Sequence, residues 1–465
     1  MFRTGSVLWN RLRSLWNTNG FERVAVGFLL IATLANNLLW SATIPFVGDP
    51  YGAPDEIHHF EVPRFAFTYH RYPVFGSDRD LYIRVPPGQP DDIYHRIYGW
   101  YAASPWGAYL YGAATMFALG WTPLAGTIYS ARLSSVIMGV LVVYLAYLIA
   151  RRVFPTRMDL RLGVPFLIAS IPQVTYVSAY FNADMFSILC TTLVMYAWVE
   201  GVQNGFAWRT SVFLGLSLGL SVLTRLNCWI IVFPFSLLLL LLSWRRHPRD
   251  FVARTGLVCI IPVSVFIIWF IYNKATYGDI WAKQLVDQVW RQDRPFQISY
   301  AAQGYTFLSL LSKSPWLDWT FTSFWCRLGY MYVPLSPWYY RVILGFCAAS
   351  ALGLGLGFLR RVPKTGFWRS WRFQVLALFA VISALVIGAS LYNSFYNDFQ
   401  ALGRFVFTAL IPLGVLVVLG LGEVTTDPRG QRLIWVVAGL WMVFLQAASF
   451  NIYLIRMIVL RLPST

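Results

Sequence analysis

The feature that most constrains this chain is a series of apolar runs of roughly 17–25 residues, the length of a helix that crosses the hydrocarbon of a bilayer. Apolar residues make up 57% of the 465 positions and charged residues 12%, which is more apolar surface than a soluble core of this length can bury. The first run, from about Val24 to Ile44, is too long for a signal-peptide core, so we interpret it as a retained anchor. Further spans are expected to begin near Tyr129, Leu162, Ala183, Ser211, Cys228, Gly256, Trp338, Phe373, Leu402 and Leu433. The sequence therefore predicts an all-α polytopic membrane protein with about eleven transmembrane helices.

The charges predict how these helices are oriented. With the N-terminus in the cytoplasm, the inner segments are 1–24, 151–161, 200–210, 244–254, 360–372 and 423–432. They hold 20 of the 37 Lys and Arg residues but only 6 of the 20 Asp and Glu residues, as the positive-inside rule requires. The net charge of +17 is thereby explained by topology and contact with anionic lipids, and no basic patch with interleaved aromatics indicates nucleic-acid binding. We expect a multi-pass protein of the plasma (inner) membrane whose active site faces the periplasm or exterior.

Residues 1–465 are interpreted as a single transmembrane domain with two long outer loops, at 45–104 and 273–337. The second loop alternates aromatic and charged residues, which favours amphipathic helices on the outer leaflet. The apolar run from Arg209 to Arg245 is too long for one span, so we predict two helices joined by a tight outer turn that carries Arg225.

The densest polar cluster is Pro54-Asp55-Glu56-Ile57-His58-His59-Phe60, shortly after the first span. Pro54 and the acidic residues suit the first turn of a helix, on which Asp55 would share a face with His58 and His59. A carboxylate beside imidazoles can serve as an oriented general base or can bind a divalent metal ion. A solvated helix start with capping acids is the alternative.

Four further charged residues lie near the outer ends of predicted spans. Asp184 begins one span, and an acidic residue at the membrane is either functional or a helix cap. Arg225 and Arg404 are single cations at outer helix ends, which fits either snorkelling to headgroups or a clamp on a phosphate group. Arg327 lies in the aromatic stretch Phe324–Tyr330, where a snorkelling arginine in an interfacial aromatic belt is the alternative to a functional role.

The order of these motifs resembles the GT-C superfamily of membrane glycosyltransferases, in particular a bacterial branch with a PDE-x-x-HF motif after the first helix. Here that motif reads Pro54, Asp55, Glu56, His59 and Phe60. The similar stretches that follow are Ala131-Arg132-Leu133, Asn182-Ala183-Asp184, Leu223-Thr224-Arg225, Phe324-Trp325 through Val333-Pro334-Leu335, and Leu402-Gly403-Arg404-Phe405. Two positions depart from the family pattern: Arg225 replaces a common lysine, and Ser104-Pro105-Trp106 replaces an HPP-type motif.

The resemblance implies transfer of a sugar from a polyprenyl-phosphate donor to a glycan, lipid or protein acceptor, with inversion at the sugar. It also implies an acidic catalytic base in the first outer loop. We assign that role to Asp55, with Glu56 beside it. His59, Asp184, Arg225, Arg327 and Arg404 are assigned to the substrate, and His58 with His59 to a possible metal ion. No cofactor is required by the sequence.

Two alternatives remain open. A transporter or flippase of an anionic, lipid-linked substrate would place charges near the bilayer midplane and repeat its halves, and neither pattern is present in the sequence. A non-catalytic assembly subunit with a degenerate glycosyltransferase fold would have no need to keep both Asp55 and Glu56.

Overall fold

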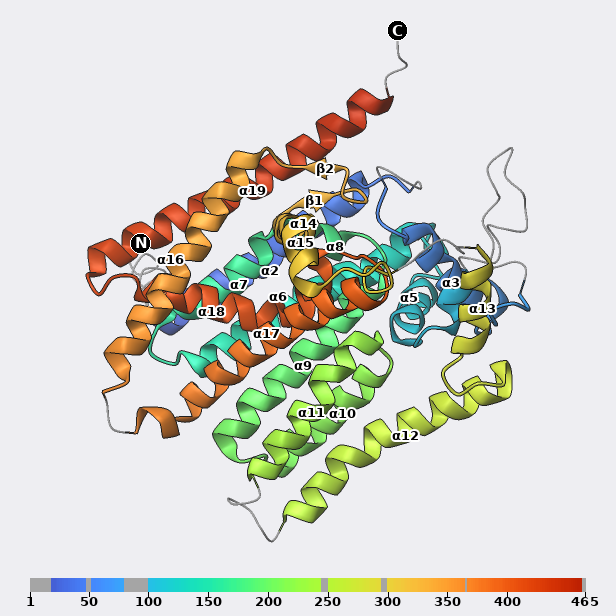
Figure 1. The fold of residues 1–465 in the computed structure, drawn as a ribbon, viewed down its shortest axis with the longest axis horizontal. Coiled ribbons are helices and arrows are strands. Elements are labelled where there is room, and N and C mark those ends of the chain that lie inside the picture. Colours follow the sequence, from blue (N-terminus) through green and yellow to red (C-terminus); the bar gives the residue numbers. More distant parts are fainter. Residues whose placement is uncertain are drawn as a thin grey trace, which may run out of the picture.

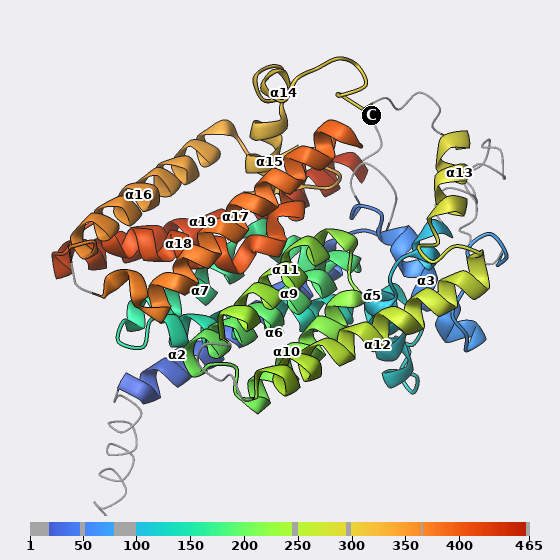
Figure 2. The same cartoon turned by 60° about the horizontal axis from the view of Figure 1, so that its bottom comes forward.

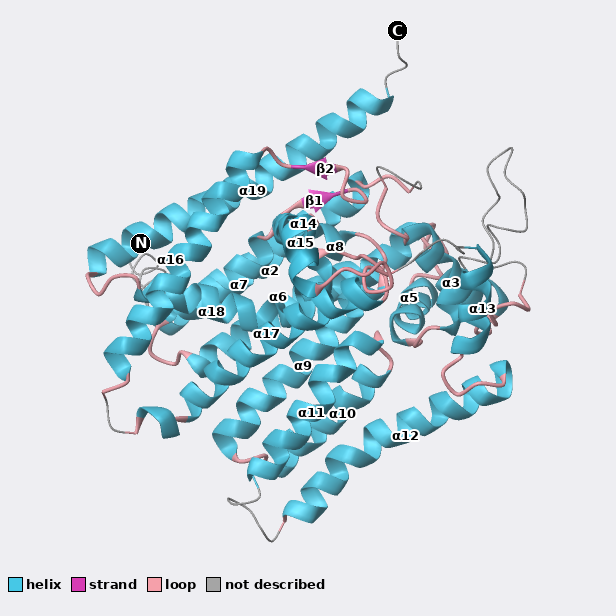
Figure 3. Cartoon of the chain, in the orientation of Figure 1, coloured by secondary structure: helices cyan, strands magenta, loops and turns pink. Residues whose placement is uncertain are grey.

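The computed structural model of the protein describes residues 18–46, 52–78, 99–243, 250–293, 299–363 and 366–461, and the fold is almost entirely helical (Figure 3). The basic start of the chain and residues 47–51 and 79–98 of the first outer loop lie outside these residues, and with them half of the eight acidic residues of that loop.

The helices before the second outer loop are α2 Thr18–Thr43, α3 Glu56–Tyr69, η2 Gly99–Ala103, α5 Gly107–Ala118, α6 Ile128–Val153, α7 Met158–Ser170, α8 Pro172–Ala179, α9 Ala183–Asn204, α10 Trp208–Val222, α11 Leu226–Ser243 and α12 Phe251–Tyr277. The later elements are α13 Lys283–Asp293, α14 Phe307–Lys313, α15 Trp316–Trp325, β1 Arg327–Leu328, β2 Val333–Pro334, α16 Pro337–Arg361, η3 Phe367–Arg369, α17 Trp371–Tyr396, η4 Gly403–Ala409, α18 Leu410–Glu423 and α19 Pro428–Arg461.

The long helices confirm the polytopic all-α membrane fold, but the expected count of eleven spans is not confirmed. Within the described ranges, eight helices are long and apolar enough to cross a membrane, or nine if the pair α7 and α8 is one bent span. That pair bends by 60° directly before Pro172, which cannot donate a backbone hydrogen bond to the preceding turn. The predicted helices on either side of Arg225 are present as α10 and α11, which are shorter than the eight.

Ion pairs and hydrogen bonds join the six predicted inner segments at one end of the bundle. Arg161 pairs with Glu22 at 2.9 Å, and Arg152 pairs with Glu200 at 3.2 Å. The Glu423 carboxylate, at the end of α18, forms ion pairs with Arg361 at 2.5 Å and with Arg157 at 3.7 Å. The Arg254 guanidinium adds α12 to this group by donating to the Phe206 carbonyl at 3.2 Å. The six loops that the positive-inside rule predicted to lie on the same side of the membrane are therefore in contact with one another at one end of the bundle.

The opposite end of the bundle carries a smaller cap of short helices. Figure 1 places α3, α5 and α13 together beside the end of α12, and Figure 2 shows them in the same group from a second direction. Their shared apolar core includes Phe60, Val62 and Tyr109, and it also takes in Phe181 from the link between α8 and α9. The second outer loop is helical, as predicted, but it also forms a short antiparallel pairing of β1 with β2, which the sequence did not predict.

Candidate functional site

A cavity of about 850 Å³ opens where the ends of several helices meet below this cap. Its walls come from η2, α5, the start of α9, the turn between α10 and α11, the last turns of α17, and η4. The only charged residues in its lining, within the part of the chain that the structure describes, are Asp55, Arg225 and Arg404. The three side chains come from positions far apart in the sequence, so the fold itself assembles this charge cluster. Ser104 and Pro105, from the stretch that replaces the HPP-type motif, also line the cavity.

Asp55 lies just before α3 rather than within it. The residue is the N-cap, with a left-handed φ of 57°, and its backbone N–H donates to the Tyr330 hydroxyl at 2.8 Å. Its carboxylate is 31% exposed and lies 3.7 Å from the Arg404 guanidinium. Asp55 thus precedes the helix instead of standing on it as predicted; its charge still acts on His58, and the residue lines the cavity.

Glu56 was predicted to act beside Asp55, but the structure turns it away from the cavity. It is 1% exposed, and its carboxylate accepts hydrogen bonds from Arg132 at 2.8 and 2.5 Å and from the Phe181 backbone at 2.8 Å. Burial raises the pKa of Glu56, while the bonds from Arg132 favour the ionised form. Both oxygens of this carboxylate accept hydrogen bonds within the protein, so Glu56 fixes the start of α3 and neither oxygen is left to bind a sugar acceptor.

Asp184 connects the two cavity arginines. It lies in the first turn of α9, whose N-cap Asn182 accepts a hydrogen bond from the Met185 backbone. The Arg225 guanidinium lies 2.7 Å from one Asp184 oxygen, and the Arg404 Nε lies 3.8 Å from the other. Burial alone would lower the pKa of Arg225, but the Asp184 carboxylate raises it above its ordinary value.

Two atoms of this cluster lack a hydrogen-bond partner among the described residues. They are Asp184 Oδ2 and Arg404 Nε, which both lie in the interior. Another nitrogen of the Arg404 guanidinium donates a hydrogen bond to the Tyr180 hydroxyl at 3.2 Å. Buried polar atoms are nearly always hydrogen-bonded in native proteins. The two atoms face each other at 3.8 Å, beyond hydrogen-bond distance, so the Arg404 Nε–H remains an unused donor in this cluster.

The two histidines do not form a metal site in the described part of the chain. His59 is 1% exposed, and its Nδ1 lies 2.9 Å from the Tyr109 hydroxyl. Burial lowers the pKa of His58 to about 4, and burial also lowers the pKa of His59 well below its ordinary value. Successive side chains on a helix point about 100° apart, and no three His, Cys, Asp or Glu side chains within the described residues could hold a metal together. The expected pairing of His58 with His59 as ligands is thus not supported by their placement.

Arg327 lies in β1, outside the cavity lining. Its Nε donates to the Met331 carbonyl at 2.9 Å, and its guanidinium stacks over Trp319 at 5.1 Å. The loop that it closes carries Tyr330, which holds the Asp55 backbone. The structure therefore places Arg327 against the loop that carries Tyr330 and not in the cavity lining.

Three residues that hold the site were not identified as such from the sequence. Arg132 is the clearest, and it could have been recognised as a lone cation near the start of an apolar span, the kind of residue that needs a partner when it is buried. Tyr109 and Tyr330 contact His59 and Asp55 from distant parts of the chain. Their pattern in the sequence does not differ from that of the many other interfacial tyrosines.

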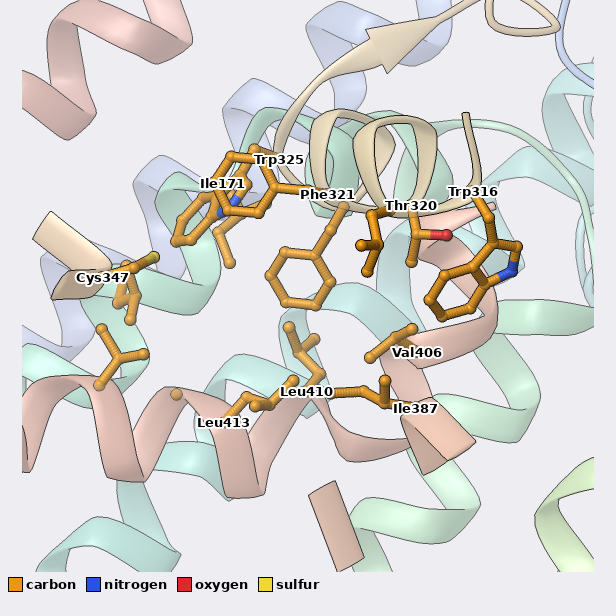
Figure 4. A pocket seen from close by; sticks show the side chains of 15 residues that line it. Ile171, Trp316, Thr320, Phe321, Trp325, Cys347, Ile387, Val406, Leu410 and Leu413 are labelled. Atoms are coloured by element: carbon orange, nitrogen blue, oxygen red, sulfur yellow. The ribbon is translucent and has the colours of Figure 1, made fainter. Parts of the chain in front are cut away.

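A second, smaller cavity of about 250 Å³ lies on the other side of η4 (Figure 4). The labelled side chains around it are mainly aromatic and aliphatic, among them Phe321, Leu410 and Trp325, and no charged residue lines it. Its lining includes the Thr320 hydroxyl and the Cys347 thiol but no carboxylate and no cation among the described residues, so it lacks the charged groups of the larger cavity.

Comparison with known proteins gives one family and one fold. Residues 107–269, which are 163 of the 465 residues, match the dolichyl-phosphate-mannose-protein mannosyltransferase family. No curated protein matches the chain.

Three solved structures illustrate the fold. The apo oligosaccharyltransferase of Archaeoglobus fulgidus aligns over 94% of this chain and 56% of its own, with a TM-score of 0.56 and 12% identity. The same organism's AglB, in complex with an inhibitory peptide and a dolichol-phosphate, aligns over 95% and 56% with a TM-score of 0.56 and 12% identity. ArnT from Cupriavidus metallidurans, bound to undecaprenyl phosphate, aligns over 90% and 62% with a TM-score of 0.53 and 14% identity. This chain spans less than two thirds of the length of each of these proteins. The fold is that of the GT-C membrane glycosyltransferases, which confirms the predicted resemblance to this superfamily. The resemblance to the bacterial branch with the PDE-x-x-HF motif stays a prediction.

Proposed function

We propose that this membrane protein with the GT-C fold is a glycosyltransferase that moves a sugar from a polyprenyl-phosphate carrier to an acceptor on the extracytoplasmic face. The observation that carries the proposal is the 850 Å³ cavity, whose lining brings together one carboxylate, Asp55, and two cations, Arg225 and Arg404. Such a cavity offers a base for an acceptor and a binding site for a phosphate group.

The proposed reaction uses each of these groups once. The Asp55 carboxylate takes the proton of an acceptor hydroxyl, whose oxygen attacks the anomeric carbon of the sugar from the side opposite the phosphate. The new glycosidic C–O bond forms as the bond to the phosphate oxygen breaks, so the configuration inverts. Arg225 and Arg404 stabilise the charge that develops on the departing lipid phosphate. Because a phosphate leaves readily, one carboxylate suffices, whereas glycoside hydrolysis usually needs two.

The relatives support the choice of substrates. The ArnT structure contains undecaprenyl phosphate, and one AglB structure contains a dolichol-phosphate and a peptide. The matched family is described by a dolichyl-phosphate-linked donor. For this chain we accordingly propose a polyprenyl-phosphate-linked donor and a glycan, lipid or protein acceptor, with the protein in the plasma (inner) membrane and its N-terminus in the cytoplasm.

The transporter alternative is less consistent with where the charges lie. The charged residues of the site, Asp55, Asp184, Arg225 and Arg404, lie at the ends of helices. Two further ion pairs among the described residues also lie at helix ends: Arg132 with Glu56 near the starts of α6 and α3, and Arg361 with Glu423 at the opposite end of the bundle. A path for an anionic substrate would instead need charges near the middle of the bundle. A non-catalytic assembly subunit would not need a partly exposed carboxylate in the cavity.

The deciding experiment replaces Asp55 with Asn and compares envelope glycans by mass spectrometry in cells that carry the natural or the variant protein. We expect the product to disappear, with unchanged expression and unchanged binding of undecaprenyl phosphate by the purified protein. Asp287→Asn is the matched control, because that carboxylate is exposed on α13 and pairs only loosely with Lys283, at 3.9 Å. An Asp55→Asn variant that still makes product would remove Asp55 from the role of base. Loss of activity on treatment with a chelator would show that a divalent ion is also required.

A further inference from the structure

One wall of the cavity is formed by the last turns of α17 and has a polar face. Val386, Ser390, Asn393 and Asn397 line the cavity at spacings of four, three and four residues, which places them along one side of the helix and its C-cap. Neither Asp55 nor the two arginines lies on this element. The mechanism proposed above gives this face no role.

Ser390 carries a buried hydroxyl for which the described residues provide no hydrogen-bond partner. Its side chain is 8% exposed and lines the cavity, and its Oγ makes no hydrogen bond within the described residues. Serine inside an apolar helix commonly donates to the carbonyl four residues earlier. Ser383, two turns earlier on the same helix, does so by bonding the Phe379 carbonyl at 2.8 Å. The unpaired Ser390 hydroxyl therefore indicates a ligand group that hydrogen-bonds inside the cavity.

The neighbouring amides extend this face toward the opening. Asn397 Nδ2 donates to Asn393 Oδ1 at 3.0 Å, which fixes the two side chains relative to each other. The bond uses one polar atom of each amide and leaves the other for a ligand. A hydroxyl and two amides in a row offer both donors and acceptors without charge, which matches the vicinal hydroxyls of a sugar.

The charges of the cavity are already balanced before any sugar binds. Arg225 and Arg404 face Asp55 and Asp184 within 3.8 Å, so the cluster carries two positive and two negative charges. The carrier phosphate would bring one more negative charge. A uronic acid would add a second negative charge, and an amino sugar would place an ammonium group against the α17 wall, where no carboxylate lines the cavity among the described residues. Because a desolvated charge without a partner is costly, an uncharged ring fits this wall.

We propose that Ser390, Asn393 and Asn397 form a surface that recognises the hydroxyl groups of an uncharged sugar ring. The inference rests on the proposed function and names the class of sugar that this same site selects. The ring could belong to the donor or to a glycan acceptor, since both present the same hydroxyl chemistry. On another side of the cavity, Leu226, Ile230 and Ile231 of α11 provide an apolar wall that suits the hydrocarbon of the carrier.

The test measures binding to the purified full chain in detergent. The donor probes are short polyprenyl phosphates that are bare or carry glucose, mannose, galactose, glucuronic acid or glucosamine. The acceptor probes are the methyl glycosides of the same sugars, added with bare polyprenyl phosphate at saturation. The variants are Ser390→Ala and Asn393→Ala, and Ser383→Ala is the matched control because it removes a hydroxyl from the same helix outside the cavity lining.

We expect at least one neutral hexose to bind better than its charged counterparts. Ser390→Ala and Asn393→Ala should each weaken that binding roughly three- to tenfold, the effect of losing one neutral hydrogen bond, and should leave the affinity for bare polyprenyl phosphate unchanged. A loss confined to the carrier-linked probes assigns the surface to the donor, and a loss confined to the methyl glycosides assigns it to the acceptor. Ser383→Ala should change neither affinity.

Two results would overturn the inference: equal or tighter binding of the charged rings, or neutral-ring binding that neither α17 variant weakens. The proposed function fails in a separate way, since it requires bare polyprenyl phosphate to bind and Arg225→Ala to weaken that binding. The two failures can therefore be distinguished in the same set of measurements.

Discussion

The Arg132 guanidinium donates to both carboxylate oxygens of Glu56, a residue 76 positions earlier in the chain, at 2.8 and 2.5 Å. Both side chains are 1% exposed. The same guanidinium also donates to the carbonyls of Ser41 and Ile44, at 2.5 and 2.9 Å. One side chain of α6 thereby fixes the end of α2 and the start of α3, and so fixes the position of Asp55.

Replacing Arg132 with Met should strongly destabilise the protein, because it leaves the Glu56 carboxylate buried without its partner. We expect a loss of about 3–5 kcal/mol in the free energy of unfolding, measured by tryptophan fluorescence in detergent. The double variant Arg132→Met with Glu56→Leu should recover much of the loss, since no charge then remains buried. A single variant as stable as the natural protein would contradict the structural role of this pair.

Replacing Arg225 or Arg404 with Lys should weaken the binding of undecaprenyl phosphate about tenfold, and replacing either with Ala should weaken it up to about a hundredfold. Lysine keeps the charge but lacks the planar fork that bonds two phosphate oxygens together. Affinity can be measured by native mass spectrometry. Arg152→Lys is the control, because Arg152 pairs with Glu200 at the other end of the bundle. Unchanged affinity in both lysine variants would remove the arginines from the phosphate site.

The contact between α16 and α18 depends on Gly353. A Cβ atom at this position would lie 1.9 Å from the Gly420 carbonyl oxygen, so Gly353→Ala must push the two helices apart. We expect a loss of about 1–3 kcal/mol in stability and a lower melting temperature. Gly345→Ala on the same helix is the matched control, because a Cβ there meets no atom within 4 Å and alanine favours the helix. Equal melting temperatures for the two variants would show that the close approach is not present.

Acid should destabilise the protein through His58. Burial lowers the pKa of His58 to about 4 in the folded chain, against 6.5 for an ordinary histidine, although Asp55 acts in the opposite direction. The unfolded chain therefore takes up this proton at a higher pH than the folded chain. The contribution of His58 to stability is complete above pH 6.5 and is lost as the pH falls from 6.5 to about 4, which amounts to roughly 3 kcal/mol.

The pH dependence can be assigned by comparing the natural protein with His58→Gln. Between pH 7.5 and 5, the free energy of unfolding of the natural protein should fall more steeply than that of the variant, measured by denaturant titration. Parallel curves for the two proteins would show that His58 titrates normally in the folded state.

The sequence alone determined the class of the protein and the rough position of its site. Apolar runs longer than any soluble core can bury require a bilayer, and the excess of Lys and Arg in alternate loops assigned those loops to one side. In the structure, residues of these loops form ion pairs at one end of the bundle, Arg161 with Glu22 and Arg361 with Glu423. The isolated charges Asp184, Arg225 and Arg404 stood out in the sequence because a charge at the membrane is costly without a purpose, and the structure brings them together.

What the tertiary structure decided is the direction in which each side chain points. Asp55 and Glu56 are adjacent and chemically alike, yet one faces a cavity and the other is buried against Arg132. The difference comes from a left-handed φ at Asp55 and from partners on α6 and at Phe181, neither of which a local pattern encodes. Likewise, Ser383 and Ser390 are both serines in the apolar run of α17, and nothing in the sequence distinguishes their roles. In the folded chain the Ser383 hydroxyl bonds to its own helix, whereas the Ser390 hydroxyl at the cavity has no hydrogen-bond partner among the described residues. Long-range contacts set these orientations because each depends on atoms that the chain brings close only when it is folded.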